Sequence, residues 1–394
     1  MQIDSLHIQN YRALQNVTIN NIPRMAVFMG QNGAGKTTFF DVFSFLHDCL
    51  DKNVRSALSI RGGFQEVVSR EQKGDLKFDI AFRPSSNEPR IAYELIIGLN
   101  NEGIPIVKKE ILYLMRGQQE SPWKVLDFAL GEGVVTQGDV QSHSDVQEAA
   151  LKHQKLSAPD ILAIKGLGQF DNYPAIASLR RLIEDWYVAD FRIEAARGRQ
   201  LANYSESLST TGDNLAQVAR YLYDNDKSRF SQILKSISER IPGVDSIDAT
   251  LTEDGYVVLR FQDGSFQSPF SPKSVSDGTM KLFAYLIMLS DPSPYALLCV
   301  EEPENQLYPQ LLAQLAEEFR NYSNNGGQVF ISTHSPDFLN AVYLDELYCI
   351  IKENGYTRIV RASESELVSS LCKEGDLLGE LWTQDILLNE AKKL

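Results

Sequence analysis

The segment that most constrains this chain is a glycine-rich octapeptide near its beginning, Gly30-Gln31-Asn32-Gly33-Ala34-Gly35-Lys36-Thr37. It follows an uninterrupted apolar run, residues 25–29, of the kind found in buried parallel strands. Apolar residues at helical spacing come after it, so we expect the octapeptide between a strand and a helix. Its glycines let backbone amides surround a polyphosphate, and the N-terminus of the helix attracts the same anion. The segment predicts a phosphate-binding loop rather than a chance glycine-rich turn.

The residues of this loop have separate expected roles. Lys36 would place its ammonium group on the β and γ phosphates, and Thr37 would offer its hydroxyl to Mg²⁺. The expected nucleotide-binding set is Gly30, Asn32, Gly33, Ala34, Gly35, Lys36, Thr37 and Thr38. ATP and Mg²⁺ are the cofactors that such a loop implies.

A second buried strand is predicted over residues 295–300, and two adjacent carboxylates, Glu301 and Glu302, follow it. Neighbouring residues on a strand point to opposite sides, so the two side chains cannot do the same work. We expect Glu301 in the Mg²⁺ shell and Glu302 as the general base that polarises the attacking water. The alternative is a solvated acidic pair at a strand end, and the phosphate-binding loop argues against it.

A third apolar strand, residues 328–332, leads directly into Thr333-His334-Ser335-Pro336. Ligands collect at the carboxyl ends of strands in open α/β sheets. A lone histidine is more often structural, but this position favours His334 as a sensor of the γ-phosphate. Lys36, Glu302 and His334 are therefore the expected catalytic residues of an ATPase.

With these segments in place, the chain resembles the ABC-type ATPases of the SMC/RecF class. Within that class it is similar to stand-alone bacterial ATPases related to the ATPase half of OLD nucleases and to anti-phage defence ATPases such as PARIS. Residues 6–14 resemble the first strand of the class with its Asn-aromatic-Arg turn, and residues 276–279 resemble its signature motif. Residues 302–309 resemble the catalytic glutamate with the following D-loop. The likeness covers residues 1–70 and 270–342.

The resemblance implies an ABC-type P-loop NTPase of the α/β class, with a mixed sheet, an antiparallel β arm and a helical inserted subdomain. Ser276 and Gly278 would reach ATP bound by a second subunit, which implies a homodimer or higher homo-oligomer. Asn305 belongs to the D-loop. The glutamine loop of the class, which contributes to the metal site, has no sure match; Gln65 is the candidate, and an ordinary loop residue is the alternative. Glu301 stands where Asp is more usual, and the signature lacks the double glycine of transporters.

We expect three parts along the chain. Residues 1–140 form the N-terminal half of the ATPase domain with the β arm, residues 141–245 a mainly helical insertion, and residues 246–394 the C-terminal half. The arm is expected to contain strands at 76–82, 91–99 and 106–115. The insertion is expected to contain helices around 176–186 and 215–222 with a strand at 187–191, and hairpins are expected at 247–261 and 347–360. No sustained heptads occur, which argues against the long coiled coil of true SMC proteins.

Charge and composition limit the partners. A net charge of -14 and a pI near 4.9 oppose nonspecific adhesion to nucleic acid. A local basic face for double-stranded DNA could still involve Arg180, Arg181, Arg192, Arg197 and Arg199, and internal ion pairs are an equally good reading. Four scattered cysteines indicate reduced thiols. With no signal peptide and no apolar run near the roughly 18 residues of a membrane span, we expect a soluble cytoplasmic protein.

Two biological roles remain open. The first is the sensor ATPase of an anti-phage defence system that controls a separate effector, a nuclease or toxin, because only 60 residues follow His334 and they contain no nuclease-like acidic cluster. The second is a RecF-like DNA-binding ATPase of DNA repair. A scaffold that binds ATP without turnover is a weaker third reading. Residues 375–382 resemble the closing segment of the stand-alone ATPases, and we expect its Leu-Trp end to be core rather than a partner dock.

Overall fold

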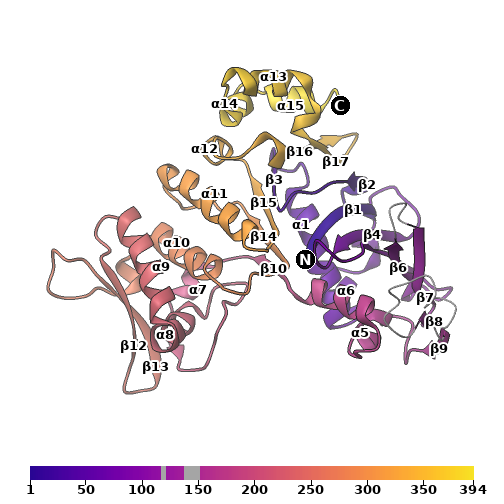
Figure 1. Cartoon of the computed structure of the whole chain (residues 1–394), viewed down its shortest axis with the longest axis horizontal. Coiled ribbons are helices and arrows are strands. Elements are labelled where there is room, and N and C mark those ends of the chain that lie inside the picture. The colour runs from indigo at the N-terminus through magenta and orange to yellow at the C-terminus, as the bar shows by residue number, and fades with distance from the viewer. Residues whose placement is uncertain (117–120, 137–150) are drawn as a thin grey trace.

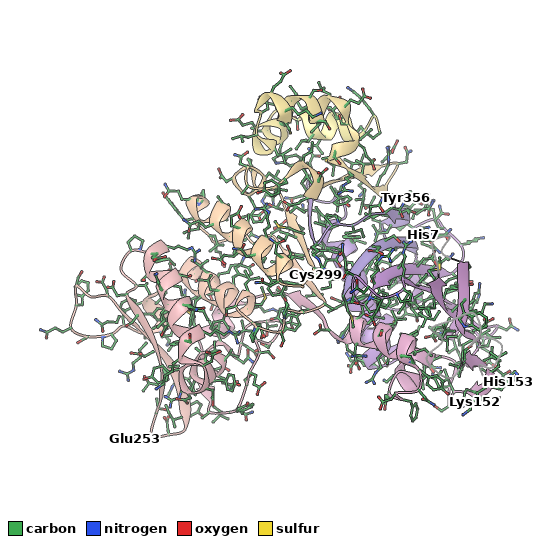
Figure 2. All side chains as sticks on the ribbon, in the orientation of Figure 1. His7, Lys152, His153, Glu253, Cys299 and Tyr356 are labelled. Atoms are coloured by element: carbon green, nitrogen blue, oxygen red, sulfur yellow. The ribbon has the colours of Figure 1, made fainter. Side chains whose placement is uncertain are left out.

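A computed structural model of the chain describes residues 1–116, 121–136 and 151–394. Figure 1 shows a central parallel sheet with a large antiparallel sheet on one side, a mostly helical lobe on the other, and a cap of C-terminal helices at one end. Figure 2 shows how far these parts extend: His153 and Glu253 lie at opposite extremes, and Cys299 lies near the middle. All four cysteines are free, as predicted. None of the described helices is long and apolar enough to cross a membrane.

The central sheet has six strands. Its order is β10 (Trp186–Ala189), β14 (Leu297–Glu301), β15 (Val329–Thr333), β3 (Met25–Gly30), β16 (Leu347–Glu353) and β17 (Tyr356–Arg361). Only β17 runs antiparallel to its neighbour. Every residue of β3 and β15 is buried, which explains the continuous apolar run of β3 and the apolar first three residues of β15. The predicted strands at 25–29, 295–300 and 328–332 and the hairpin at 347–360 are confirmed, with ends displaced by a few residues.

Helix α1 (Lys36–Asp51) packs against one face of this sheet. Its Phe39 ring lies 4.7 Å from the Phe28 ring of β3, and its Phe43 ring lies 5.5 Å from Phe330 of β15. The opposite face, with Val27 and Met29, packs in a second core with α10 (Asp277–Leu289), α11 (Pro309–Asn324) and the C-terminal helices. This packing fixes the position of the first turn of α1 relative to the carboxyl ends of β3 and β15.

The second sheet has eight strands, and each pair of neighbours is antiparallel. Its order is β2 (Leu14–Ile19), β1 (Gln2–Tyr11), β4 (Leu76–Arg83), β5 (Ile91–Leu99), β6 (Pro105–Arg116), β7 (Ser121–Ala129), β8 (Glu132–Thr136) and β9 (Leu151–Lys155). The three strands predicted for the β arm are confirmed. The arm continues the sheet of β1 and β2, and β9 is a strand where the sequence predicts helical structure. All five residues of β9 are exposed, so it carries no apolar periodicity that could reveal it.

The remaining elements cover the two sheets. Beside the eight-stranded sheet lie α5 (Ala163–Leu167) and α6 (Pro174–Glu184), as Figure 1 shows. Helix α2 (Val54–Ile60) contacts β6 of the same sheet, and α3 (Phe64–Val67) contacts α2. The helical lobe contains α7 (Ile193–Ala196), α8 (Leu215–Asn225), α9 (Lys227–Arg240) and a small sheet of β11 (Gln200–Leu201), β13 (Tyr256–Gln262) and β12 (Ser246–Leu251). After β15 come α12 (Pro336–Leu339) and the cap helices α13 (Glu366–Glu374), α14 (Leu378–Thr383) and α15 (Ile386–Ala391). Three short 3-10 turns complete the described elements, at Pro272–Ser274, Leu344–Glu346 and Ala362–Glu364.

The helices predicted around 176–186 and 215–222 are α6 and α8, and the hairpin predicted at 247–261 is β12–β13. The predicted strand at 187–191 is β10, which starts one residue earlier and ends at Ala189. In the part of the chain that the structure describes, the longest helices, α1 and α11, have 16 residues, and no coiled-coil arm is present.

Candidate active site

The glycine-rich loop joins β3 to α1, as the sequence predicts. Gly33 and Gly35 adopt positive φ angles of 78° and 112°, a conformation that favours glycine. A Cβ at Gly35 would lie 2.1 Å from Oγ1 of Thr357, and a Cβ at Gly30 would lie 2.5 Å from the Ile350 carbonyl oxygen. The β16–β17 hairpin therefore packs directly against the loop, and larger residues at these glycines would displace it.

Thr357 is a loop-supporting residue that sequence reasoning missed. It is buried, and its hydroxyl donates a hydrogen bond of 2.8 Å to the carbonyl oxygen of Ala34. Its own N–H donates to the carbonyl of Ala13, after β1. Nothing in the sequence around Thr357 indicates these contacts, because they join segments more than 300 residues apart.

Lys36, the first residue of α1, is buried beneath the loop. Its ammonium group donates 2.8 Å to the carbonyl oxygen of Gly30 and lies 3.8 Å from Oε1 of Glu302. Ala34 is also buried, whereas Asn32 and Thr37 are exposed and Thr38 is half-buried. The loop thus combines a buried ammonium group, that of Lys36, with the solvent-exposed polar side chains of Asn32 and Thr37.

Glu301 and Thr37 form the candidate metal position. Burial raises the pKa of Glu301, and the nearby carboxylates of Glu302, Asp190 and Asp41 raise it further, whereas a hydrogen bond with the Thr37 hydroxyl acts in the opposite direction. A partly buried carboxylate among other carboxylates is stabilised by a cation. Its oxygens and the Thr37 hydroxyl are hard donors that suit Mg²⁺.

The protein supplies only part of a metal shell. Within residues 1–116, 121–136 and 151–394, no group of three or more His, Cys, Asp or Glu side chains is arranged to hold a metal ion. Mg²⁺ usually keeps several waters and binds through one or two protein oxygens plus phosphate, so two donors fit it. Gln65, the third predicted member, is exposed on α3, and no hydrogen bond joins it to Thr37 or Glu301.

Glu302 lies just beyond β14 and has a left-handed φ of 44°. This backbone conformation, and not strand alternation alone, separates its side chain from that of Glu301. Asn305 donates a hydrogen bond of 3.0 Å to Oε2 of Glu302, and Nδ1 of His334 lies 3.3 Å from Oε1. The parallel pairing of β14 with β15 brings these residues together, because both strands end at the same edge of the sheet. Lys36, Glu302, Asn305 and His334 thus form one cluster.

His334 is anchored by residues that sequence reasoning gave no role. Its backbone N–H donates 2.9 Å to Oε1 of Glu304, a buried carboxylate that also accepts the Thr333 hydroxyl at 2.8 Å. Its carbonyl oxygen accepts a hydrogen bond of 3.1 Å from the indole of Trp382. The Glu304 contact could be guessed from its place two residues after Glu302, but no local pattern points to Trp382.

The signature segment begins α10. The hydroxyl oxygen of Ser276 caps the helix by accepting the N–H of Thr279 at 3.1 Å. A Cβ at Gly278 would lie 2.5 Å from the carbonyl oxygen of Gln306, so glycine permits close contact with the D-loop. No hydrogen bond or ion pair joins residues 276–278 to residues 30–38, both of which the structure describes. Within the chain, the segment predicted as the signature therefore lies against the segment predicted as the D-loop.

Lys281 ties α10 to the segment after Glu302. It is buried in an otherwise apolar helix, and its ammonium group donates 2.9 Å to the carbonyl oxygen of Asn305 and 3.4 Å to that of Glu302. Burial lowers the pKa of Lys281, and Glu304 and Glu302 oppose that shift. Lys281 is the one charged residue in the otherwise apolar stretch of residues 280–289, and this pattern is the sequence signal that could have identified it.

Four of the five arginines predicted as a DNA path make ion pairs within the chain, and Arg181 makes none with the described residues. Arg192 lies 3.1 Å from Asp190 and Arg199 lies 3.4 Å from Asp254, while Arg197 pairs with Asp277 of the signature and donates to the Pro272 carbonyl. Arg180 pairs with Glu184 at 2.7 Å, one turn along α6. The reading of these residues as internal ion pairs thus has direct support.

Together, the doubly covered parallel sheet, the glycine loop with its buried lysine, and the acidic strand end facing His334 define a P-loop protein of the nucleotide-hydrolase type. The chain belongs to the family described as "AAA domain, putative AbiEii toxin, Type IV TA system", whose match spans residues 25–340. No curated protein matches the chain.

Solved structures agree on the fold. The chain is similar to an Smc head bound to the C-terminal winged-helix domain of ScpA, with 13% identity and a TM-score of 0.55, over 91% of this chain and 97% of that one. It is also similar to an Smc head domain with an extended coiled coil bound to the C-terminal domain of ScpA derived from Pyrococcus furiosus, with 10% identity and a TM-score of 0.52, over 95% of this chain and 100% of that one. The predicted fold class is confirmed. The narrower likeness to OLD and PARIS ATPases stays a prediction.

Proposed function

We propose that this protein hydrolyses ATP with Mg²⁺ and that Glu302 is its general base. The observation that carries the proposal is the convergence of Lys36, Glu302 and His334, with Glu302 Oε1 3.8 Å from the lysine and 3.3 Å from the imidazole. A carboxylate between these groups can accept a proton from a water that attacks the γ-phosphate. Asn305 holds the second carboxylate oxygen and thereby orients the base.

The other site residues have roles that follow from their positions. Lys36 and the loop amides neutralise charge on the β and γ phosphates, and His334 contacts the γ-phosphate. Thr37 and Glu301 hold Mg²⁺, which when bound offsets the charge that develops on the phosphates. Gln65 is supported only by its position in the sequence, because no hydrogen bond among the described residues joins it to Thr37 or Glu301.

The decisive variant is Glu302→Gln, which keeps the shape and the Asn305 contact but cannot accept the proton. We expect ATP binding to persist and the hydrolysis rate to fall by about 10²–10⁴-fold. Glu253→Gln, at the exposed hairpin tip marked in Figure 2, is the matched control and should keep the full rate. Phosphate release under single-turnover conditions measures both. Full activity in Glu302→Gln would refute the assignment of the base.

We further propose that ATP joins two copies of the chain. The loop of residues 30–38 supplies donors on one side of the γ-phosphate, and Ser276 and Gly278 of a second copy supply donors on the other. An exposed Ser276 at the start of α10 supports this arrangement, because a helix N-terminus attracts an anion. Two such sites are related by two-fold symmetry, and the free energy of ATP binding then also stabilises the dimer.

Complementation between two inactive variants tests the shared site. Ser276→Arg should bind ATP but neither dimerise nor hydrolyse it, and Lys36→Ala should not bind it. A mixture forms heterodimers with one intact loop facing one intact signature, so part of the activity should return. Analytical ultracentrifugation confirms that heterodimers form. Normal hydrolysis by Ser276→Arg alone would show that the site is not shared between two copies. Heterodimers that form but do not hydrolyse ATP would show that one intact site cannot work without the other.

For the biological role, we propose a cytoplasmic sensor ATPase of an anti-phage defence system that holds or releases a separate effector protein. The support is the family description, which names a toxin–antitoxin system, together with the acidic net charge. The DNA-repair alternative has less support, because four of the five arginines of its proposed DNA path, all except Arg181, are paired with acidic residues. Copurification from the native host with mass spectrometry tests the role: a nuclease or toxin as the stoichiometric partner supports it, and repair proteins on DNA would contradict it.

A further inference from the structure

Both backbone polar groups of His334 are held by side chains from outside its own strand and loop. The N–H donates to Glu304, and the carbonyl oxygen accepts the indole N–H of Trp382 at 3.1 Å. Glu304 belongs to the site itself, whereas Trp382 lies on cap helix α14, beyond the residues 25–340 that match the family. An element outside the matched region therefore reaches the backbone of a candidate site residue.

The contact is part of a close docking of α14 on α12, the short helix that starts two residues after His334. The N–H of Gly379 donates 2.8 Å to the side-chain oxygen of Asn340. A Cβ at Gly379 would lie 2.1 Å from the carbonyl oxygen of Pro336, so only glycine allows this approach. Leu378 and Leu381 are buried in the adjacent core, and Trp382 is half-buried against it, so the prediction that the Leu-Trp end is core is confirmed for the leucine only.

Packing alone does not account for the hydrogen bond that the Trp382 indole donates. Its ring is half-buried rather than buried, and its indole nitrogen can only donate a hydrogen bond. The acceptor that it finds is the carbonyl of the one residue whose imidazole lies 3.3 Å from Glu302. Since Glu304 fixes the other side of the same residue, the His334 backbone has little freedom to rotate away from Glu302.

We propose that Trp382 is a positioning residue for His334, through which cap helix α14 sets the hydrolysis rate. The inference rests on the proposed function, in which His334 contacts the γ-phosphate of ATP. The same contact can also carry a signal from the site to the cap, because Trp382 donates its hydrogen bond directly to the His334 carbonyl. A nucleotide that moves His334 also changes the surroundings of the Trp382 indole, and the cap thereby senses the state of the site.

Trp382→Phe tests the inference because it keeps an aromatic ring and removes the N–H donor. We expect kcat for ATP hydrolysis to fall about two- to tenfold, the effect of one hydrogen bond, with little change in KM. In a His334→Ala background the same substitution should produce no further fall, because a residue that acts through His334 has nothing left to position. Trp186→Phe is the matched control: the Trp186 indole nitrogen has no hydrogen-bond partner among the described residues, so kcat should stay at the wild-type value.

Fluorescence gives a second readout that does not need turnover. In the Glu302→Gln protein, ATP should change the tryptophan emission, and the change should disappear when Trp382→Phe is added. Gly379→Ala, which forces α14 away from Pro336, should lower kcat in the same His334-dependent way as Trp382→Phe.

The outcomes separate this inference from the function on which it rests. A wild-type protein that binds but does not hydrolyse ATP would overturn the proposed function and the inference with it. An active wild type with an unchanged Trp382→Phe variant would overturn the inference alone. If Trp382→Phe lowers kcat by the same factor in the wild-type and His334→Ala backgrounds, the inference is also overturned, because Trp382 would then act independently of the histidine.

Discussion

The two large sheets of this protein place their charged residues differently. In the six-stranded sheet, β3 and β15 are buried along their whole length, and Lys36, Glu302 and His334 lie just beyond strand ends. In the eight-stranded sheet, buried and half-buried residues alternate along strands such as β5. The charged residues there lie within strands and pair across them, as Lys109 does with Glu94 at 2.8 Å.

The difference follows from the two kinds of sheet. A parallel sheet covered on both faces leaves no room for charges within its strands, so polar chemistry collects in the loops at the carboxyl edge. An antiparallel sheet with one open face can hold many charges, but cross-strand partners neutralise them. Charge at the first sheet therefore lies in loops at the strand ends, where a ligand can replace its partners, whereas charge at the second lies within strands beside cross-strand partners.

The strongest test of this contrast compares two lysines. Lys36→Ala should abolish ATP binding, because losing one partner of a buried charged contact costs about 2–5 kcal/mol, on the order of 30- to several-thousand-fold in affinity. Lys109→Ala removes a lysine of the same kind from the antiparallel sheet and should leave the affinity unchanged. Isothermal titration with ATP measures both. Similar losses in the two variants would break the contrast.

Among the described side chains of the antiparallel sheet, Glu110 is the one buried carboxyl group, and it should give the next largest effect. Burial raises the pKa of Glu110 from 4.5 to about 7, although the backbone N–H groups of Ala163 and Ile164 and the Tyr93 hydroxyl act in the opposite direction. Because the folded-state pKa is the higher one, the proton stabilises the fold. The contribution is complete below pH 4.5 and lost as the pH rises through 7, about 3 kcal/mol in all.

Urea unfolding from pH 4.5 to 8 measures this contribution, with Glu110→Gln as the comparison. The free energy of unfolding of the wild type should fall relative to that of Glu110→Gln as the pH rises across this range. A difference that does not change with pH would show that the pKa of Glu110 is not raised in the folded protein relative to the unfolded chain.

The smallest effect is expected for the cross-strand pair of Lys109 and Glu94 on the open face. The hydrogen bond to Glu94 raises the pKa of Lys109, but the lysine side chain is exposed to solvent. Exposed pairs of this type contribute only about 0.2–1 kcal/mol. A double-mutant cycle with Lys109→Ala and Glu94→Ala, followed by thermal unfolding, measures the coupling. A coupling above about 2 kcal/mol would mean that charge on this face is a structural determinant, as it is at the active site.

Prediction from the sequence succeeded where a feature depends on contiguous residues. The strand, glycine loop and first helix around Lys36 follow from one short pattern. The acidic strand end follows from a run of six apolar residues, and the strand before His334 from the three apolar residues 329–331. It failed for β9, because five exposed residues have no buried face to produce a period. It also could not show that the β arm continues the sheet of β1 and β2, since hydrogen bonding between strands joins segments far apart in the chain.

By itself, then, the sequence determined the local chemistry: a buried lysine at the start of α1, a carboxylate pair after β14 and a histidine after β15. Only the tertiary structure decided which neighbours support them, with Thr357 beneath the loop, Arg197 on the signature and Trp382 behind His334. The physical reason is distance along the chain. Backbone conformation and burial depend on nearby residues and leave a periodic trace, whereas a hydrogen bond across 48 or 323 residues exists only after the sheets and helices have packed.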